Sequence, residues 1–160
     1  MFHITILVVG RLKEKYLSDG ISEYLKRLSA YAKIELYEVE GERFPENLSL
    51  IGRQKVKDKE GTRLLNLLRA NTFLIAMDEK GEMCSSEEMA GLLNKLALAG
   101  DSDITIAIGG SLGLSKKITE RADLILSFSR LTFPHQLFRL ILMEQLYRWF
   151  KINRGEPYHH

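Results

Sequence analysis

Three glycines stand close together at the end of an apolar run, in the stretch ITIAIGGSLGLS over residues 104–115. Glycine has no Cβ, so it lets the backbone bend tightly or lie directly against a ligand. The spacing G-G-x-x-G fits neither the dinucleotide fingerprint G-x-G-x-x-G nor the phosphate loop G-x-x-x-x-G-K-[ST], and Lys116 and Lys117 lie beyond the loop. The stretch therefore predicts a backbone-lined site that suits a neutral or zwitterionic, adenine-bearing ligand better than a triphosphate.

A second group of residues that could bind a substrate or take part in a reaction lies in the closing segment KINRGEPYHH. Arg154 offers a guanidinium group that can bind phosphate, Tyr158 a ring for stacking, and His159 an imidazole. Arg154-Gly155 predicts the end of a helix, and Pro157 prevents the helix from resuming. A frayed tail is the alternative, but this mixture of residues favours contact with RNA.

Strand and helix patterns alternate along the whole chain. Strands are predicted at Phe2–Val9, Lys33–Glu40, Thr72–Asp78, Ser102–Ile108 and Leu124–Phe128. Most of them are continuous or nearly continuous apolar runs, as expected of strands buried on both faces. Helices are predicted between them, at Lys15–Ala30, Leu50–Ala70, Ser86–Leu98, Lys116–Arg121 and Pro134–Lys151. Ser85 with Glu88 forms a capping box for the third helix, and Ser115 can cap the fourth. This alternation predicts an α/β fold with a mainly parallel sheet flanked by helices.

Unusual sequence follows three of the predicted strands: MDEKG after the third, GGSLG after the fourth and SFSRLTFPH after the fifth. Ligands of open α/β sheets bind at the carboxyl ends of the strands. Each segment alone reads as an ordinary turn, but the three together favour a shared pocket. That pocket would offer few charges and several hydroxyl groups, from Ser111, Ser127, Ser129 and Thr132.

The predicted last helix is apolar on nearly every side, because its polar residues scatter around the helical wheel. A fully buried core helix is one explanation. A helix covered by its own sheet and by a second protomer is the explanation that we favour, and it predicts a homodimer.

Bulk composition is that of an ordinary globular protein, with 45% hydrophobic and 28% charged residues in 160. We expect one domain over residues 1–160, with 151–160 as a functional tail and Gly41–Ser49 as the most mobile loop. The single cysteine excludes an internal disulfide and fits a reducing compartment. No apolar run approaches the roughly 20 residues that span a bilayer. A cytoplasmic location, with no membrane partner, is the expectation.

Taken together, IGGSLGLS, LSFSRLTFPHQLFRLILMEQLYRWFKI and RGEPYH resemble the ribosomal RNA large subunit methyltransferase H family of the SPOUT superfamily. The resemblance covers the chain from Gly10-Arg11-Leu12-Lys13 to the tail. It departs at His160, where the family more often has Lys or Arg. Members methylate N3 of a pseudouridine in 23S ribosomal RNA, on the large subunit or the whole ribosome.

The resemblance implies S-adenosylmethionine as cofactor and no metal. It also implies a C-terminal trefoil knot, although true knots are rare in proteins. The cofactor-binding residues that it implies are Met77, Gly109, Phe128, Ser129, Arg130, Leu131, Thr132 and Phe133. Arg154, Tyr158 and His159 would position the substrate. The acceptor of the N3 proton stays open between a side chain and water. We interpret His135 as structural or loop-orienting, and His3 as packed.

Two other functions share some of these features. A non-catalytic RNA-binding or ribosome-binding protein with a degenerate pocket would keep the tail and lose the cofactor. A nucleotide-dependent oxidoreductase would show an acidic residue after G-x-G-x-x-G, a pattern that this sequence lacks.

Overall fold

A computed structural model describes residues 1–159, in which five strands and five helices alternate. Their bounds are β1 Phe2–Val9, α1 Lys15–Leu28, β2 Ala32–Val39, α2 Leu50–Leu65, β3 Phe73–Met83, α3 Ser86–Leu98, β4 Asp103–Ile108, α4 Lys116–Arg121, β5 Leu124–Ser127 and α5 His135–Asn153. All ten predicted elements exist. The first strand and the third and fourth helices have the predicted bounds, and the largest shortfall is α2, which ends at Leu65 rather than at Ala70.

The strands form one sheet in the order β2-β1-β4-β3-β5, and all its pairings are parallel. This confirms the predicted α/β class. Strand β1 is a continuous apolar run because both of its faces are covered. Ile4, Ile6 and Val8 enter one core, and Leu7 and Val9 enter the other. The trefoil knot stays a prediction of the resemblance.

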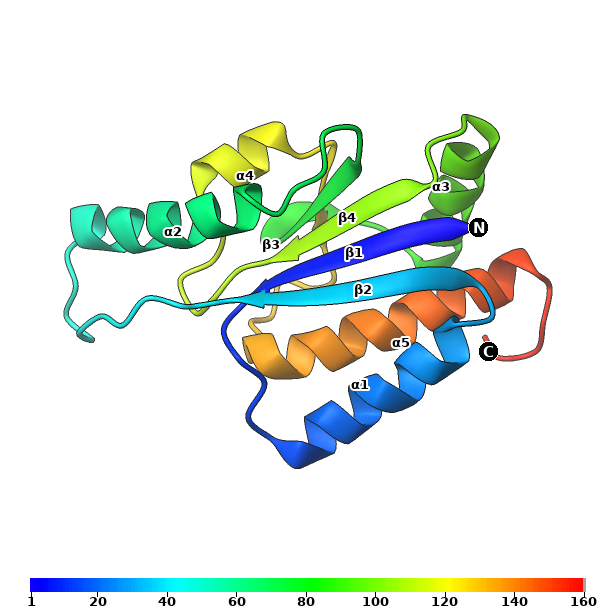
Figure 1. Ribbon diagram of the computed structural model, residues 1–160, viewed down its shortest axis with the longest axis horizontal. Helices are drawn as coiled ribbons and strands as arrows, with labels where there is room; N and C mark the ends of the chain where they lie inside the picture. Colours follow the sequence, from blue (N-terminus) through cyan, green and yellow to red (C-terminus); the bar gives the residue numbers. More distant parts are fainter. Residues whose placement is uncertain (160) are drawn as a thin grey trace.

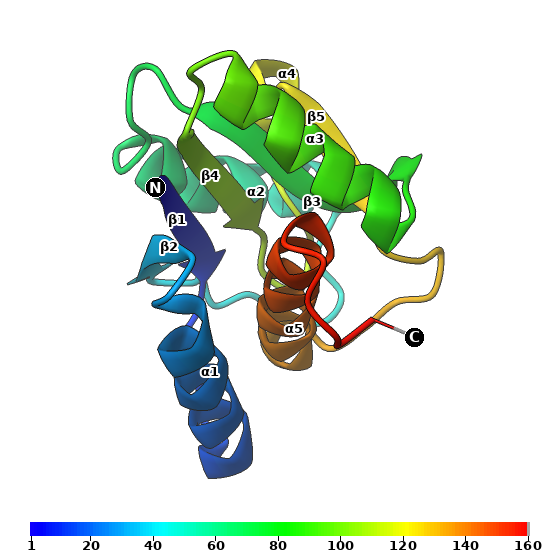
Figure 2. The ribbon, with the colours of Figure 1, turned by 90° about the vertical axis from the view of Figure 1, so that its right-hand side faces the viewer.

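Helices cover both faces of the sheet (Figure 1). On one face lie α1, α3 and α5, which pack into the larger core, and on the other lie α2 and α4, which pack into the smaller one. Figure 2 shows α5 between α1 and α3, consistent with its contacts to both. The carboxyl ends of the parallel strands therefore open at one edge, near the start of α5.

The third strand is longer than predicted: it ends at Met83 rather than at Asp78, so the segment MDEKG lies within the strand and not after it. It continues from Asp78 to Met83, with a register shift between Met77 and Glu82 while it pairs with β5. Within this irregular stretch Gly81 approaches the backbone of β5, where an added Cβ would lie 2.7 Å from the carbonyl oxygen of Ile125. The neighbouring strand supplies hydrogen-bond partners that the local sequence does not reveal, so the ladder resumes beyond the bulge.

Helix α5 is covered mainly within its own chain. Every residue from His135 to Asn153 is at least partly buried, beneath the sheet, the two neighbouring helices and the returning tail. Its polar residues also find local partners, such as Gln145, whose side-chain oxygen accepts a hydrogen bond from Ser86 at 2.8 Å. The apolar pattern is thus largely that of a core helix, the explanation that we had favoured less. The homodimer stays a prediction.

Helix ends follow the predicted signals in most cases. Ser85 and Glu88 form a capping box, and Gly155 takes a left-handed φ of +63° just after α5. Ser115 is the N-cap residue of α4, but its side chain makes no capping hydrogen bond. Pro134 precedes the first turn of α5 instead of lying within it. None of the helices within residues 1–159 has the length and apolarity to cross a membrane.

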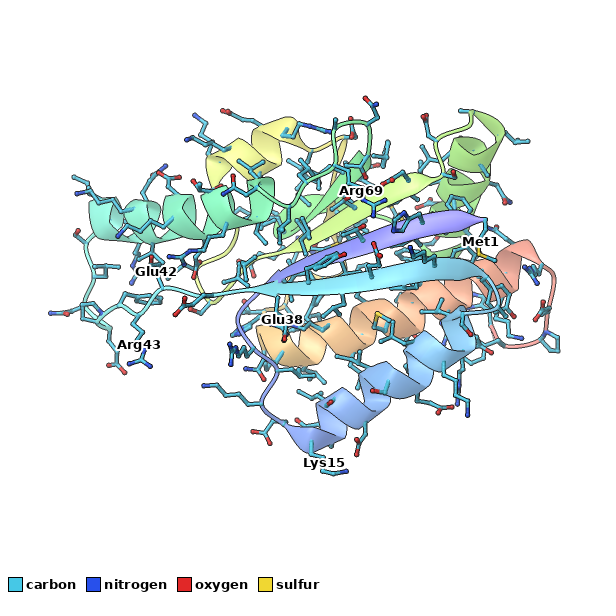
Figure 3. The ribbon with its side chains drawn as sticks, viewed as in Figure 1. Met1, Lys15, Glu38, Glu42, Arg43 and Arg69 are labelled. Atoms are coloured by element: carbon cyan, nitrogen blue, oxygen red, sulfur yellow. The ribbon has the colours of Figure 1, made fainter. Side chains whose placement is uncertain are left out.

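A polar cluster ties the strands together at the opposite edge from the strand carboxyl ends. Arg69 donates to Glu35 at 3.0 Å and to Asp103 at 3.1 Å, and Figure 3 labels it beside the start of β1. His3 lies 2.7 Å from the same Glu35 carboxylate. These contacts fit the interpretation of His3 as a packed structural residue.

Candidate active site

A cavity of about 670 Å³ opens at the carboxyl ends of β3, β4 and β5. This volume lies within the usual range for small-molecule sites, about 300–1,000 Å³. Its walls are the end of β3 around Met77–Lys80, the glycine loop around Gly109–Leu114, the segment Phe128–Pro134 and the first turn of α5. The three segments with unusual sequence therefore do share one pocket.

The predicted cofactor residues converge on this cavity with one exception. Those that line it are Met77, Gly109, Phe128, Ser129, Leu131, Thr132 and Phe133. Arg130 is not part of the lining and its side chain is exposed. In an extended segment successive side chains point in different directions, so one member of such a run can face solvent.

The glycine loop is crowded by its own backbone. A Cβ on Gly109 would lie 2.5 Å from the carbonyl carbon of Gly113, closer than any real Cβ contact. The Gly113 amide donates to the Gly110 carbonyl at 3.0 Å, and Gly113 has a φ of +92°. Two of the three glycines are thus required by the fold of the loop itself: Gly109 by close approach and Gly113 by its left-handed backbone.

Hydroxyl groups brace the segment that follows β5. Ser127 is buried and donates to the carbonyl oxygen of Ser129 at 2.9 Å, so it supports the wall and does not line the cavity as predicted. The Ser129 hydroxyl accepts from the Leu131 amide at 3.0 Å. Thr132 donates to Glu79 at 2.9 Å and joins this wall to the end of β3. These hydrogen bonds link the segment after β5 to itself and to the end of β3.

Among residues 1–159, one histidine lines the cavity: His135, at the start of α5. Burial lowers the pKa of His135, and the neighbouring Arg139 guanidinium lowers it further, so the imidazole is neutral at neutral pH. Arg139 is 1% exposed and donates to the Val9 and Gly10 carbonyl oxygens at 3.0 and 2.7 Å. It also pairs at 2.8 Å with Glu38, which Figure 3 labels at the end of β2.

Sequence reasoning missed most of the charged residues of the cavity, namely Lys57, Asp78, Glu79 and Lys80. The last three lie in the MDEKG segment, and their position at the end of a predicted strand could have indicated that they line the pocket. Lys57 comes from α2 and carried no local signal, because only the tertiary packing of α2 against the glycine loop brings it to the rim.

The tail folds back along α5 and lies apart from the cavity. Arg154 stacks 4.5 Å from the centroid of the Tyr31 ring. Tyr158 packs edge-on against Tyr147, with centroids 4.8 Å apart. His159 lies 2.6 Å from Glu87 on α3 and 3.0 Å from Arg148. The tail is therefore packed against its own chain as far as His159.

None of the three predicted substrate-positioning residues lines the cavity of its own chain. His135 and Phe138 of α5 line the cavity. Tyr158 and His159 contact α5 further along, at Glu144 and Arg148. Phe138 and Arg148 are ten residues apart, which is about 15 Å along a helix. The structure thus assembles the cofactor residues in one place and the tail residues in another.

Comparison with known proteins gives a consistent family. The profile of a family described as predicted SPOUT methyltransferase matches residues 2–159. A protein of Pelotomaculum thermopropionicum called ribosomal RNA large subunit methyltransferase H is 70% identical over the full length of both chains. The chain belongs to this family. A protein of the same name from Desulforamulus reducens is 57% identical over 99% of each chain.

A solved structure shares the fold at low sequence identity. It is described as a probable methyltransferase from Bordetella pertussis Tohama I, and it is 16% identical with a TM-score of 0.55. The match covers 92% of this chain and 93% of the other. At that identity the likeness concerns the fold alone, and it agrees with the five-stranded parallel sheet.

Proposed function

We propose that this chain is an S-adenosylmethionine-dependent methyltransferase that methylates N3 of a pseudouridine in 23S ribosomal RNA. The observation that carries the proposal is the cavity in which the three sequence-predicted segments meet, in a chain 70% identical to a protein called ribosomal RNA large subunit methyltransferase H. Residues 1–159 form one α/β unit around a single sheet, which fits a substrate that is already folded. We therefore favour the assembled ribosome over free RNA.

The cavity fits the proposed cofactor in size and in chemistry. Its glycine loop presents main-chain groups without side chains, and its other walls present rings and hydroxyl groups in place of a phosphate-binding pattern. Backbone donors and acceptors can read an adenine and a ribose, while Phe128 and Phe133 offer apolar surface. No metal is required, and no cluster of three or more potential metal ligands occurs within residues 1–159.

The proposed chemistry is an in-line displacement. The cofactor supplies an electrophilic methyl group on a sulfonium; N3 of the base forms the new N–C bond, the S–C bond breaks, and the N3 proton leaves to a base or to water. The main task of the protein is to align the nucleophile with the methyl carbon. The fixed walls of the cavity support this alignment on the cofactor side.

The substrate side is completed, in this proposal, by the tail of a second protomer. None of Arg154, Tyr158 and His159 lines the cavity of its own chain, which leaves that cavity without RNA-binding side chains from the tail. In a homodimer the tail of one protomer reaches the cavity of the other, and each site then uses both chains. Arg154 binds phosphate, and Tyr158 and His159 hold the base.

Isothermal titration with S-adenosylmethionine tests the cofactor first. We expect one site per chain, together with methyl transfer to ribosomes that lack the modification. A chain that binds ribosomes but not the cofactor would instead be an RNA-binding protein with a degenerate pocket.

Mixed dimers test the shared site. One chain carries Gly109→Val and the other lacks residues from Pro157 onward, so that each parent dimer is inactive. Light scattering should give about twice the chain mass of 18.3 kDa. Mixed dimers should regain activity, because one of their two sites combines an intact cavity with an intact tail. Mixed dimers that form and remain inactive would place the tail in the site of its own chain.

A further inference from the structure

Helix α2 carries a buried carboxyl group that the proposed chemistry does not use. Glu60 is 5% exposed, and its Oε2 atom accepts a hydrogen bond from the Glu42 amide at 3.0 Å. Its Oε1 atom has no hydrogen-bond partner in the described part of the chain. A buried polar atom without a partner is costly for stability, so its persistence requires a reason.

This carboxyl group lies directly behind one wall of the cavity. Gly110 lines the cavity, and a Cβ added to it would lie 3.3 Å from Oε1 and 3.4 Å from Oε2 of Glu60. Gly41 packs against the same group from the opposite loop, with a Cβ position 3.4 Å from Oε2. Gly110 therefore lies between the Glu60 carboxyl group and the proposed cofactor site.

Few charges surround Glu60. Arg63, one turn further along α2, pairs with Glu42 at 2.7 Å, and Figure 3 labels Glu42 beneath α2. Val9 and Gly110, which carry no charge, lie beside the carboxyl group on the side of the strand and the glycine loop. One turn before it, Lys57 lies at the rim of the cavity.

Burial raises the pKa of Glu60, while the Glu42 amide and the charge of Arg63 oppose the rise and the Glu42 carboxylate adds to it. The ionised form of such a group gains stability from any cation brought close to it, because the intervening medium is poorly polarisable. A cation bound across Gly110 would therefore lower the pKa of Glu60 and release a proton.

We propose that Glu60 makes the cavity prefer the methyl donor, which has a net positive charge, over the product of the reaction, which has no net charge. S-adenosylmethionine carries a sulfonium and an ammonium against one carboxylate, and S-adenosylhomocysteine has lost the sulfonium charge. A carboxylate behind the glycine wall attracts the donor more strongly than the product. Glu60 is thus a specificity-determining residue that touches neither reacting atom. This inference rests on the proposed function.

The test compares the affinities of the two ligands in wild type and in Glu60→Gln, a variant of the same shape without the charge. Calorimetry at pH 7.5 should give a loss of roughly tenfold to a hundredfold for the donor, as expected of unit charges about 6–12 Å apart at an effective dielectric constant near 20. Affinity for the product should stay within about twofold. Glu46→Gln, which removes an exposed charge from the loop before α2, should change neither.

The pH dependence gives a second readout. In wild type the donor affinity should rise with pH as Glu60 ionises, relative to that of the product, and Glu60→Gln should lose this difference. The ammonium group of the ligand and His135 titrate equally in both proteins, so the comparison isolates Glu60. Wild type alone, measured in two buffers of different ionisation enthalpy, should release more protons on binding the donor than on binding the product.

Three results would overturn the inference or its basis. Equal loss of both affinities in Glu60→Gln would mean that Glu60 only packs against the loop. Equal proton release with both ligands in wild type would exclude the linkage, even if the variant failed to fold. A wild-type chain that binds neither ligand would instead refute the proposed function.

Discussion

The cavity and the tail are built from different parts of the chain. Backbone atoms shape the cavity: the Gly113 amide closes the glycine loop at 3.0 Å, and the approach of Gly109 to that residue leaves no room for a Cβ. Side chains hold the tail, through the stack of Arg154 on Tyr31 and the pairing of His159 with Glu87.

This difference predicts different mechanical behaviour. A close-packed loop has few alternative arrangements, so the cavity is preformed. The exposed pair of His159 and Glu87 contributes about 0–1 kcal/mol, so His159 can exchange this contact for another partner at small cost. A fixed cofactor site with a releasable substrate-binding tail is what the proposed shared site requires.

The largest effect is expected from Gly109→Val. The new side chain would meet the backbone of Gly113, which cannot move without opening the loop. Binding of S-adenosylmethionine should fall below detection by calorimetry, while circular dichroism reports a folded chain with a lower melting temperature. Gly91→Ala is the matched control, because nothing lies within 4 Å of a Cβ at that helical position. Unchanged cofactor affinity in the valine variant would remove the glycine loop from the site.

The sequence predicted the cavity better than the tail, for a physical reason. Strand runs and glycines such as Gly109 are local signals, and parallel strands bring their carboxyl ends together whatever follows them. The return of Tyr158 and His159 onto α5 and α3 depends on contacts between residues far apart in the chain, which no local pattern encodes. The same holds for Lys57 and for the extension of β3 past Met77, since both depend on a neighbouring element.

Deleting residues from Pro157 onward separates the two regions more cleanly. Methyl transfer to ribosomes should be abolished, because the deleted segment contains Tyr158 and His159. Affinity for S-adenosylmethionine should stay within a few-fold of wild type, since neither residue lines the cavity. The assay is methyl incorporation with a parallel calorimetric titration. A large loss of cofactor affinity would show that the tail supports the cavity of its own chain.

Arg154→Ala should have a smaller and more specific effect. Loss of one phosphate contact lowers the slope of log affinity against log salt by roughly one unit. Ribosome binding measured across a salt series should therefore become weaker and flatter. Arg154→Lys should retain the slope, because it keeps the charge while losing the planar stack on Tyr31. Lys95→Ala, on the exposed side of α3, is the control, and an equal change in that variant would reduce the effect to net charge.

The smallest expected effect is the dependence of stability on pH. The cavity and the tail should lose stability in different pH ranges. The pKa of His135 is lowered by burial, so the unfolded chain binds a proton more readily than the folded one. The contribution of His135 to stability is then full above its ordinary value of 6.5 and is lost as the pH falls below it. In the tail, hydrogen bonds from Lys151 and Tyr31 lower the pKa of Glu156, so its contribution is full above 4.5 and is lost only below that value.

Urea unfolding at pH 7.0, 6.0 and 5.0 measures the first window, in wild type and in His135→Asn. The free energy of unfolding should fall more steeply in wild type than in the variant as the pH decreases. Glu60 titrates in both proteins, so its opposing effect cancels when the two are compared. Proteolysis of the tail between pH 5.0 and 3.5 measures the second window, with Glu156→Gln as the comparison. The tail could instead become sensitive to protease at a higher pH than the one at which His135 lowers the free energy of unfolding. That result would mean that the tail contacts depend on a group other than Glu156.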